Sequence, residues 1–253
     1  MLKHRVIPTL LIQNGDLIKT SKFKNAEYIG DPVNAIKIFN EKEVDELIVL
    51  DVSKSKEKLE PDYDLIEEFA GECFMPLTYG GGIKTLEQAG RIFRLGVEKI
   101  CINSLCFQDV STIKSMVKIF GSQSIVASID VKKTLFGRYK LYDSSSSCSY
   151  DAKFLENHLQ QLLHVGVGEI MLGSIDKDGT LSGPDLNIIK KVSEKIRIPL
   201  ISIGGVSSLE DIKNSVLAGA SAVAAGAFFV FHGKRRAVLI TYPSYQELEA
   251  LLN

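Results

Sequence analysis

Short hydrophobic runs alternate with amphipathic stretches along almost the whole chain. The runs are continuous rather than alternating in polarity, which is typical of strands buried on both faces, as in parallel sheets. They occupy residues 5–12, 47–51, 75–79, 99–102, 125–130, 169–173, 199–203 and 222–225. Between them, apolar residues recur at helical spacing near 32–42, 62–72, 85–95, 109–120, 152–165, 184–196 and 208–218, with a last helix near 244–252. Eight strand-then-helix units predict a closed (β/α)8 TIM barrel.

An open, doubly wound sheet is the alternative arrangement of the same units. A dinucleotide-binding sheet of that kind carries a GxGxxG motif after its first strand, and none follows residues 5–12. A length of 253 residues is usual for one barrel, so residues 1–253 are predicted to form a single domain.

An internal repeat supports the barrel. The segment PLTYGGGIKTLE, which begins at Pro76, matches PLISIGGVSSLE, which begins at Pro199. The same offset relates two further pairs, Gly96 with Gly219 and Glu46 with Glu169. A repeat of about half the chain is too long for a solenoid and indicates two duplicated half-barrels.

Composition narrows the classes of function. The formal net charge is −1, so no global charge points to nucleic acid or to an anionic membrane surface. No apolar run approaches the ~18 residues of a membrane-spanning helix, and we expect no signal peptide before the first strand. The four cysteines lack CxxC spacing and the four histidines lack ligand spacing. We expect a cytoplasmic protein with reduced thiols, no metal and no cofactor, bound neither to nucleic acid nor to a membrane.

Glycines follow two predicted strands at corresponding places of the repeat. Gly81 and Gly82, and likewise Gly204 and Gly205, lie where backbone N–H groups and a helix N-terminus favour an anion. Neighbouring loops extend the predicted phosphate-binding set with Asn103, Ser104, Gly179, Gly226 and Ala227. Ordinary glycine turns are the alternative, but the loops after strands seven and eight are the usual phosphate site of barrels. Two such sites suit a bisphosphorylated or elongated substrate.

Lysines gather in the loop after the first strand. Lys19, Lys22 and Lys24 lie within residues 16–28 and would close over a phosphate if the loop moves. For Lys22 and Lys24, a solvated loop surface is the alternative.

Several motifs belong to one family. They are GDP at 30–32, DEL at 45–47, YGGGI at 79–83, FGSQ at 120–123 and EIMLGSIDKDGT at 169–180. With them the chain resembles, from about residue 3 to 230, HisF, the cyclase subunit of imidazole glycerol phosphate synthase. The resemblance implies a barrel that binds a bisphosphate, with a glutaminase subunit (HisH) docked at its N-terminal face and ammonia passing through the barrel. From about residue 232 the chain departs from the family.

The catalytic pair of such cyclases is incomplete in this chain. Two aspartates, at the ends of the first and fifth strands, serve there as general acid and base. Asp130 matches the fifth-strand position, but Leu11 occupies the first-strand position, and the internal repeat also aligns Leu11 with Asp130. A leucine cannot transfer a proton. The resemblance further implies catalytic roles for Lys19 and Asp178, with capping of the next turn as the alternative for Asp178.

Charged residues stand at the starts of four strands: Arg5, Glu46, Lys99 and Glu169. By resemblance they form a salt-bridged gate for ammonia at the barrel bottom. A charge plug that only seals the barrel is the alternative. Buried ion pairs are costly unless mutually satisfied, so their presence calls for a reason.

The missing aspartate, beside a retained gate and retained phosphate loops, favours a paralogue. VIPTLL in the first strand, FKN at 23–25 and NEKEVDEL at 40–47 are similar to the WbuZ group of HisF-like proteins. The resemblance implies a subunit of a glutamine amidotransferase system that takes ammonia from a HisH-like glutaminase. With a separate amidotransferase, it would support amidation of a phosphorylated (nucleotide-)sugar in lipopolysaccharide biosynthesis. Whether the barrel itself performs the chemical step stays open.

Three alternatives remain. A cyclase of histidine biosynthesis would use Asp130 with Lys19 or Asp178 in place of the lost acid. A non-catalytic scaffold would only activate the glutaminase. The single-substrate sugar isomerase of the histidine pathway shares the fold but also needs an aspartate at position 11.

Overall fold

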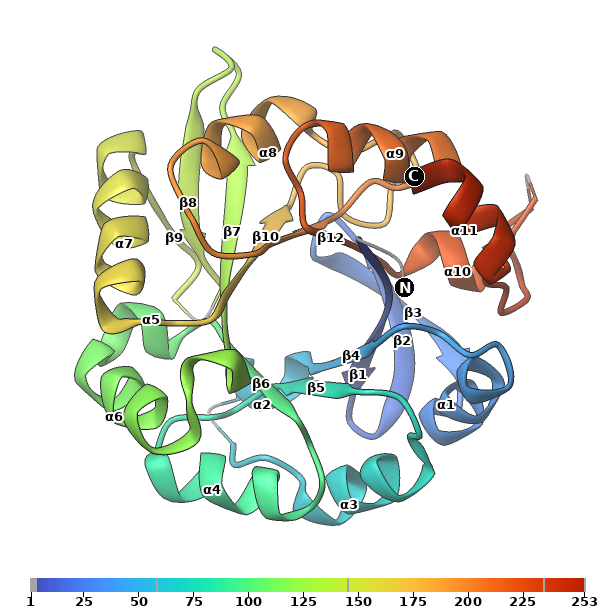
Figure 1. Ribbon diagram of the computed structural model, residues 1–253, viewed down its shortest axis with the longest axis horizontal. Coiled ribbons are helices and arrows are strands. Elements are labelled where there is room, and N and C mark those ends of the chain that lie inside the picture. Colours follow the sequence, from blue (N-terminus) through green and yellow to red (C-terminus); the bar gives the residue numbers. More distant parts are fainter. Residues whose placement is uncertain (1–3, 58, 145, 234, 253) are drawn as a thin grey trace.

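The computed structural model describes residues 4–57, 59–144, 146–233 and 235–252 (Figure 1). Eight parallel strands form its centre: β1 (Arg5–Gln13), β4 (Leu47–Asp51), β5 (Leu77–Gly80), β6 (Lys99–Ile102), β7 (Ile125–Lys133), β10 (Glu169–Ser174), β11 (Leu200–Ile203) and β12 (Ala222–Ala225). Each pairs with the next, and β12 returns to β1, where Arg5 lies opposite Ala222. The sheet is therefore closed, and the predicted (β/α)8 barrel is confirmed.

A ring of helices surrounds the strands, as Figure 1 shows. These helices are α1 (Pro32–Glu41), α3 (Tyr63–Glu72), α4 (Leu86–Arg94), α6 (Val110–Phe120), α7 (Ala152–Val165), α8 (Leu186–Ser193), α9 (Leu209–Leu217) and α11 (Tyr245–Leu252). Most of them begin at an Asp, Ser or Thr whose side chain accepts a backbone N–H bond of the first turn. At α4 the cap is reciprocal, because Gln88 also bonds the backbone N–H of Thr85. These caps explain why the predicted and observed helix starts nearly coincide.

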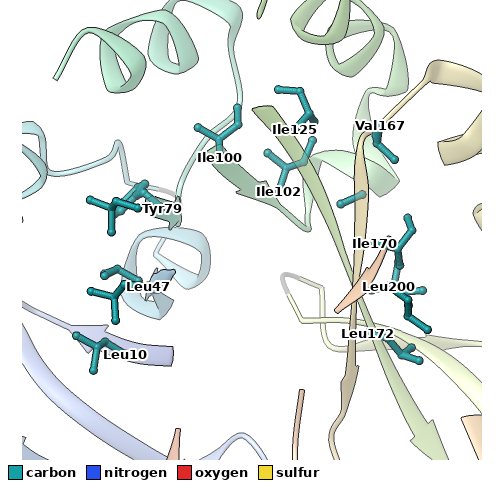
Figure 2. Close-up of a cluster of buried hydrophobic side chains, with 14 of the residues drawn as sticks. Leu10, Leu47, Tyr79, Ile100, Ile102, Ile125, Val167, Ile170, Leu172 and Leu200 are labelled. Atoms are coloured by element: carbon teal, nitrogen blue, oxygen red, sulfur yellow. The ribbon is translucent and has the colours of Figure 1, made fainter. Parts of the chain in front are cut away.

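Alternation along the strands divides the core into two layers. The outer layer, between strands and helices, is large and includes Leu10, Leu47 and Tyr79 (Figure 2). The layer inside the barrel is small, and its members are Ile7, Ile48, Cys101, Val126, Met171, Ile201, Ala222 and Ala224. Ile7 and Val126 thus identify which residues of β1 and β7 point into the barrel.

Additional elements follow the barrel strands on the side of their carboxyl ends. They are β2 (Asp16–Ser21), β3 (Lys24–Gly30), α2 (Val52–Lys56), α5 (Leu105–Gln108), β8 (Tyr139–Asp143), β9 (Cys148–Tyr150), α10 (Ala227–Val230), β13 (Phe231–His232) and β14 (Ala237–Val238). A short 3-10 turn (Ser122–Ser124) lies instead at the amino end of β7. The prediction of a loop at residues 16–28 is wrong, because β2 and β3 form an antiparallel hairpin there. We call residues 16–30 the loop-one hairpin. Within the described residues, no helix combines the length and apolarity needed to span a bilayer.

Candidate functional site

Leu11 and Asp130 occupy corresponding points of the barrel mouth. Leu11 lies four residues after Ile7 on β1, and Asp130 lies four residues after Val126 on β7. Since Ile7 and Val126 face the barrel interior, residues an even number of positions further along each strand face it too. The alignment of these two positions by the internal repeat therefore agrees with their geometry, and an aliphatic side chain stands where the family resemblance expects a second carboxyl group.

The carboxyl group of Asp130 is buried and held by one amide. Its Oδ2 accepts a hydrogen bond from Asn103 Nδ2 at 3.0 Å. Burial raises the pKa of Asp130 to about 7; the Asn103 bond opposes this shift and the charge of Asp178 adds to it. A side chain at position 173 would overlap the Asp130 carboxyl oxygen, so Gly173 of β10 makes room for it. An acid with a pKa near neutrality can both donate and accept a proton at physiological pH.

The ammonium group of Lys19 points into the barrel rather than to solvent. Lys19 belongs to β2 and is buried, and its Nζ donates to the backbone oxygen of Thr9 at 2.6 Å. Burial lowers the pKa of Lys19 to about 8, while the charge of Asp178 opposes this change. Lys22 and Lys24, in contrast, are exposed. Of the three lysines predicted to close over a phosphate, the structure brings only Lys19 to the mouth.

Asp178, in the loop that follows β10, binds the loop-one hairpin through hydrogen bonds. Its carboxylate accepts from Thr20 Oγ1 at 2.8 Å and from the backbone N–H of Phe23 at 3.1 Å. Its backbone oxygen accepts from the N–H of Lys22 at 2.9 Å. At Gly179 a side chain would overlap the Thr20 backbone, so the two loops approach too closely for any other residue. Asp178 therefore bonds to loop one rather than capping its own turn.

A pocket that is open to solvent lies between these loops. Part of the predicted phosphate set lines it, namely Gly179, Gly204, Gly205, Gly226 and Ala227. Leu11, Lys19 and Asp178 line the same pocket, so one cation and one carboxyl group face the glycine loops. A Cβ atom at Gly226 would lie 2.7 Å from Lys19 Nζ and 3.2 Å from the Thr9 backbone oxygen, so a side chain there would displace the Lys19 ammonium group.

The other predicted phosphate residues lie elsewhere on the rim. At Gly81 and Gly82, a Cβ atom would lie 2.6 Å from the Asp51 backbone oxygen and 2.8 Å from that of Leu59. These glycines thus pack against the loop after β4. Asn103 directs its amide to Asp130 and to the Ser128 backbone oxygen, and Ser104 precedes α5. Phosphate binding by Gly81, Gly82, Asn103 and Ser104 stays a prediction.

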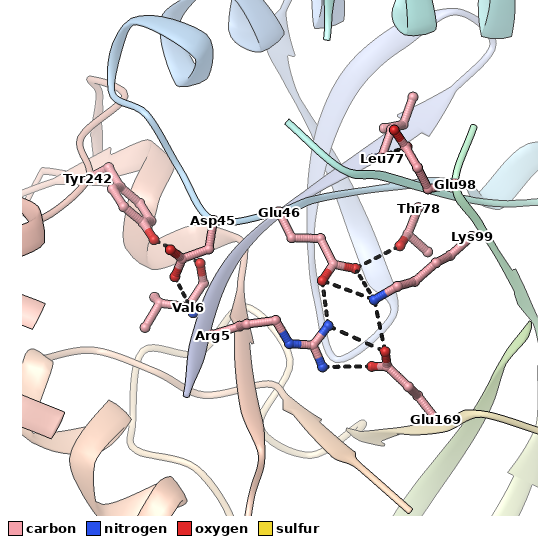
Figure 3. A network of polar contacts seen from close by, with 10 residues as sticks. All are labelled: Arg5, Val6, Asp45, Glu46, Leu77, Thr78, Glu98, Lys99, Glu169 and Tyr242. Atoms are coloured by element: carbon pink, nitrogen blue, oxygen red, sulfur yellow. Dashed lines mark hydrogen bonds and ion pairs between the residues drawn. The ribbon is translucent and has the colours of Figure 1, made fainter. Parts of the chain in front are cut away.

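The four charged residues predicted to converge do meet at the opposite end of the barrel (Figure 3). We call Arg5, Glu46, Lys99 and Glu169 the charged ring. Glu46 accepts from the Arg5 guanidinium and from Lys99 Nζ at 3.1 Å. Glu169 accepts from Arg5 Nη2 and from Lys99 Nζ, both at 2.8 Å. Burial works against the ionised form of Glu169, but hydrogen bonds and the charges of Arg5 and Lys99 outweigh it and lower its pKa.

A second layer of polar contacts, which no motif or spacing predicted, lies beside the charged ring. Thr78 Oγ1 donates to Glu46 at 2.9 Å. Next to Arg5, both backbone polar groups of Val6 are hydrogen-bonded to side chains. The Val6 N–H donates to Asp45 Oδ2 at 3.1 Å, and the Val6 oxygen accepts from Tyr242 Oη at 2.8 Å (Figure 3). Tyr242 lies in the stretch that departs from the family, so no motif pointed to it.

No group of three or more His, Cys, Asp or Glu side chains in the described part of the chain is arranged to hold a metal ion. The side chains of Asp130, Lys19 and Asp178 at the mouth can transfer protons and stabilise the charge of an anion.

Comparison with known proteins identifies the family. The model of a family described as histidine biosynthesis protein matches residues 5–235. A protein of Pseudomonas aeruginosa, provisionally named imidazole glycerol phosphate synthase subunit hisF2, is 49% identical over 250 residues, covering 98% of this chain and 99% of the relative. A provisionally named HisF subunit of Leptospira interrogans is 49% identical over 253 residues, covering 99% of both chains. The imidazole glycerol phosphate synthase subunit HisF of Exiguobacterium sibiricum is 36% identical over 229 residues, covering 90% of this chain and 91% of the relative. The chain therefore belongs to the histidine biosynthesis protein family, in which it is a HisF homologue.

Proposed function

We propose that this chain is the ammonia-accepting barrel of a glutamine amidotransferase system. A HisH-like glutaminase docks at the N-terminal face, and its ammonia passes the charged ring toward the mouth. There the barrel supports amidation of a phosphorylated (nucleotide-)sugar for surface polysaccharide, together with a separate amidotransferase. The chain does not act as an efficient imidazole glycerol phosphate cyclase.

The observation that carries this proposal is the asymmetry between Leu11 and Asp130. Both face the barrel interior at corresponding points of β1 and β7. Asp130 has a pKa near 7 and suits acid–base work, whereas Leu11 offers no proton. Loss of one positioned acid or base typically lowers a rate about 10²- to 10⁴-fold. A cyclase mechanism that needs two such groups is therefore disabled at one of them.

Retained features support the ammonia route and the phosphate. The charged ring is complete, with each carboxylate contacting both cations. Such a buried network needs full mutual satisfaction to be tolerated, so its completeness speaks for a role beyond packing. Lys19 and the glycine loops share one pocket at the other end. The printed names of the relatives describe synthase subunits, which supports a HisH-like partner.

The alignments support a group within the family that is distinct from the Exiguobacterium HisF. The match to the Pseudomonas and Leptospira relatives runs over 250 and 253 residues, whereas the match to the Exiguobacterium HisF covers 229 and the family model ends at residue 235. The chain thus shares its departing C-terminal stretch with the first two relatives. Nucleotide sugars carry phosphates that suit the pocket between Lys19 and the glycine loops.

The decisive experiment is a cyclase assay with ammonium salts and the aminoimidazole bisphosphate substrate. The wild-type chain should turn over at least roughly 100-fold more slowly than an aspartate-containing HisF, because half of the acid–base pair is missing. Leu11→Asp should restore much of that rate. Leu11→Asn is the matched control, since it is of similar size and polarity but cannot transfer a proton.

Wild-type turnover at the rate of an aspartate-containing HisF would refute the proposal and favour the cyclase function. That second candidate has one observation in its favour, because Lys19, with a pKa of about 8, and Asp178 both line the mouth pocket. In that case Lys19→Met or Asp178→Asn should abolish the turnover.

A pure scaffold gives a different pattern. If the barrel only activates its glutaminase, Asp130→Asn should leave pathway output intact. Lys99→Met, in the charged ring, and Glu98→Gln, whose carboxylate holds the Leu77 N–H at 2.6 Å, should then still weaken stimulation of the glutaminase. Loss of sugar amidation with Asp130→Asn would exclude the scaffold.

A further inference from the structure

The turn between β7 and β8 carries two large apolar side chains in water. Leu135 and Phe136 are 103% and 92% exposed. The turn is nevertheless well formed, because the N–H of Thr134 donates to the Arg138 oxygen at 2.8 Å and the N–H of Gly137 donates to the Thr134 oxygen at 2.9 Å. The backbone therefore fixes both side chains outward. We call residues 131–142 the loop-five hairpin.

The base of the loop-five hairpin is fixed to the barrel. Val131 and Leu141 pair across its strands and are buried. The backbone N–H of Lys133 donates to Asp176 Oδ2 at 2.6 Å, and Tyr139 Oη donates to Asp185 Oδ1 at 2.7 Å. Figure 1 shows the turn extending beyond the ring of helices near α8. A hairpin held in this way cannot fold back to bury its tip.

Cations follow directly behind the tip. The loop-five hairpin contains Lys132, Lys133, Arg138 and Lys140, all exposed, and no acidic residue. None of these cations forms an ion pair with another described residue. Lys132 lies directly opposite Lys140 in the ladder, and like charges at such positions destabilise a hairpin. An external anionic surface would relieve this repulsion. The net charge of −1 for the whole chain conceals this local excess.

We propose that the loop-five hairpin docks on an anionic lipid surface, with Leu135 and Phe136 inserted below the headgroups and the four cations among the lipid phosphates. The apolar residues are outermost and the cations lie two to four residues behind them along the chain, which is the order of hydrocarbon and phosphate in a leaflet. Strand residues rise about 3.3 Å each, so the first cations lie within the roughly 5–10 Å depth of interfacial binding.

A protein partner fits the tip less well. Stable protein interfaces bury about 800 Å² on each partner and have a packed centre. The tip presents two side chains on a narrow projection, far less than such a patch. A lipid surface needs no shape complementarity, and each Lys or Arg near an anionic leaflet adds to its attraction. This inference goes beyond the proposed function and does not depend on it.

Sedimentation with vesicles tests the proposal on the full chain. The probes are vesicles of phosphatidylcholine alone and of phosphatidylcholine mixed with phosphatidylglycerol. We expect binding to the mixed vesicles, weakened by added salt, and little binding to phosphatidylcholine alone. The double variant Leu135→Ser/Phe136→Ser should bind the mixed vesicles at least roughly tenfold more weakly. The double variant Lys132→Gln/Lys140→Gln should also bind the mixed vesicles more weakly than the wild type.

Matched controls separate the tip from general hydrophobicity. Leu217→Ser and Phe74→Ser remove apolar side chains that are 75% and 87% exposed elsewhere, and both should bind like the wild type. Unchanged thermal unfolding of every variant checks the fold. Failure of the wild type to bind mixed vesicles, or equal binding by the tip variant, overturns the proposal. Self-association that is lost in the tip variant, seen by sedimentation velocity without lipid, would also overturn it in favour of a second copy of the chain.

Discussion

Ionisation of the buried Asp130 carboxyl group lowers the stability of the fold, and the size of this loss depends on pH. Burial raises its pKa from 3.8 to about 7 in the folded chain. The folded state therefore holds this proton more tightly than the unfolded state, and the stability linked to it is lost as the pH rises from about 4 through about 7. The same shift that suits Asp130 to proton transfer thus lowers stability at neutral and alkaline pH.

Asp130→Asn should therefore stabilise the fold above pH 7, because the amide imitates the protonated carboxyl group and keeps an oxygen for Asn103. We expect a gain on the order of 1–4 kcal/mol at pH 8 that shrinks toward pH 4. Urea unfolding at pH 5 and pH 8 measures it. Asp16→Asn, at an exposed position, is the control and should show no such difference. A gain that is independent of pH would contradict the shifted pKa.

The principal residues of the mouth and of the charged ring could be predicted from the sequence, but their hydrogen-bond partners could not. The repeat and the family motifs identified Leu11, Asp130 and the charged ring. The bond between Asn103 and Asp130 was missed, because Asn103 follows a strand next to glycine-rich loops and its position alone suits phosphate binding equally well. Which of two neighbours an amide contacts depends on side-chain geometry that spacing does not encode.

Hairpins are the elements that the sequence analysis missed. β3 is exposed along most of its length and lacks the apolar run or alternation by which strands are recognised. It pairs only with β2, and Asp178, a residue far along the chain, holds Thr20 of β2 and the Phe23 N–H of the turn. The eight barrel strands, in contrast, are buried on both faces, so their continuous apolar runs marked them. Caps and periodicity did the same for the surrounding helices.

Asp178→Ala should loosen the loop-one hairpin. The change removes the acceptor for Thr20 Oγ1 and for the Phe23 N–H, and hydrogen bonds to charged groups contribute about 1.5–3 kcal/mol each. Hydrogen exchange of amides 20–24 should accelerate about tenfold or more. Asp176→Ala is the control, because that carboxylate holds the Lys133 N–H instead. Equal protection of these amides in the Asp178 variant and the wild type would show that Asp178 does not hold the hairpin.

Tyr242→Phe tests the attachment of the C-terminal segment to β1. Tyr242 Oη donates to the Val6 oxygen at 2.8 Å, and loss of such a bond costs about 0.5–1.5 kcal/mol. We expect a drop of that size in the free energy of unfolding. Tyr245→Phe should be neutral, since Tyr245 is 49% exposed. A Tyr242 variant as stable as the Tyr245 control would deny this contact a structural role.

On the scale of the whole molecule, the charged ring joins strands from both halves of the chain. Lys99→Met leaves Glu46 and Glu169 with one cation between them. Breaking a buried network in this way costs about 3–5 kcal/mol, and the partial exposure of Lys99 and Arg5 places our expectation at roughly 2–3 kcal/mol at pH 7.

The cost of Lys99→Met should depend on pH. The pKa of Glu169 is lowered from 4.5, so its contribution to stability is present above that value and is lost as the pH falls through the folded pKa. The difference between the variant and the wild type should therefore shrink as the pH falls below 4.5 and through the lowered pKa of Glu169. Urea unfolding at pH 7 and at pH 3.5 checks both statements. A difference that grows on acidification would show that the ring is not an ionic network.

The overall architecture was predictable because one physical pattern, a buried strand followed by an amphipathic helix, recurs eight times. The prediction that the sheet closes into a barrel rested on the presence of eight such units and not on any single residue. The contact between β12 and β1 that completes the barrel has no signature of its own in the sequence.

The seam between β12 and β1 has a consequence for synthesis. Tyr242 bonds the chain at Val6, so the first strand is secured by a residue that is synthesised after all eight barrel strands. A ribosome-bound chain can assemble its early strand–helix units, but its first strand has an unpaired edge until the eighth strand emerges. Premature termination shortly before residue 242 would leave a barrel that is closed yet not pinned. Such a product should be an early substrate for cellular proteases.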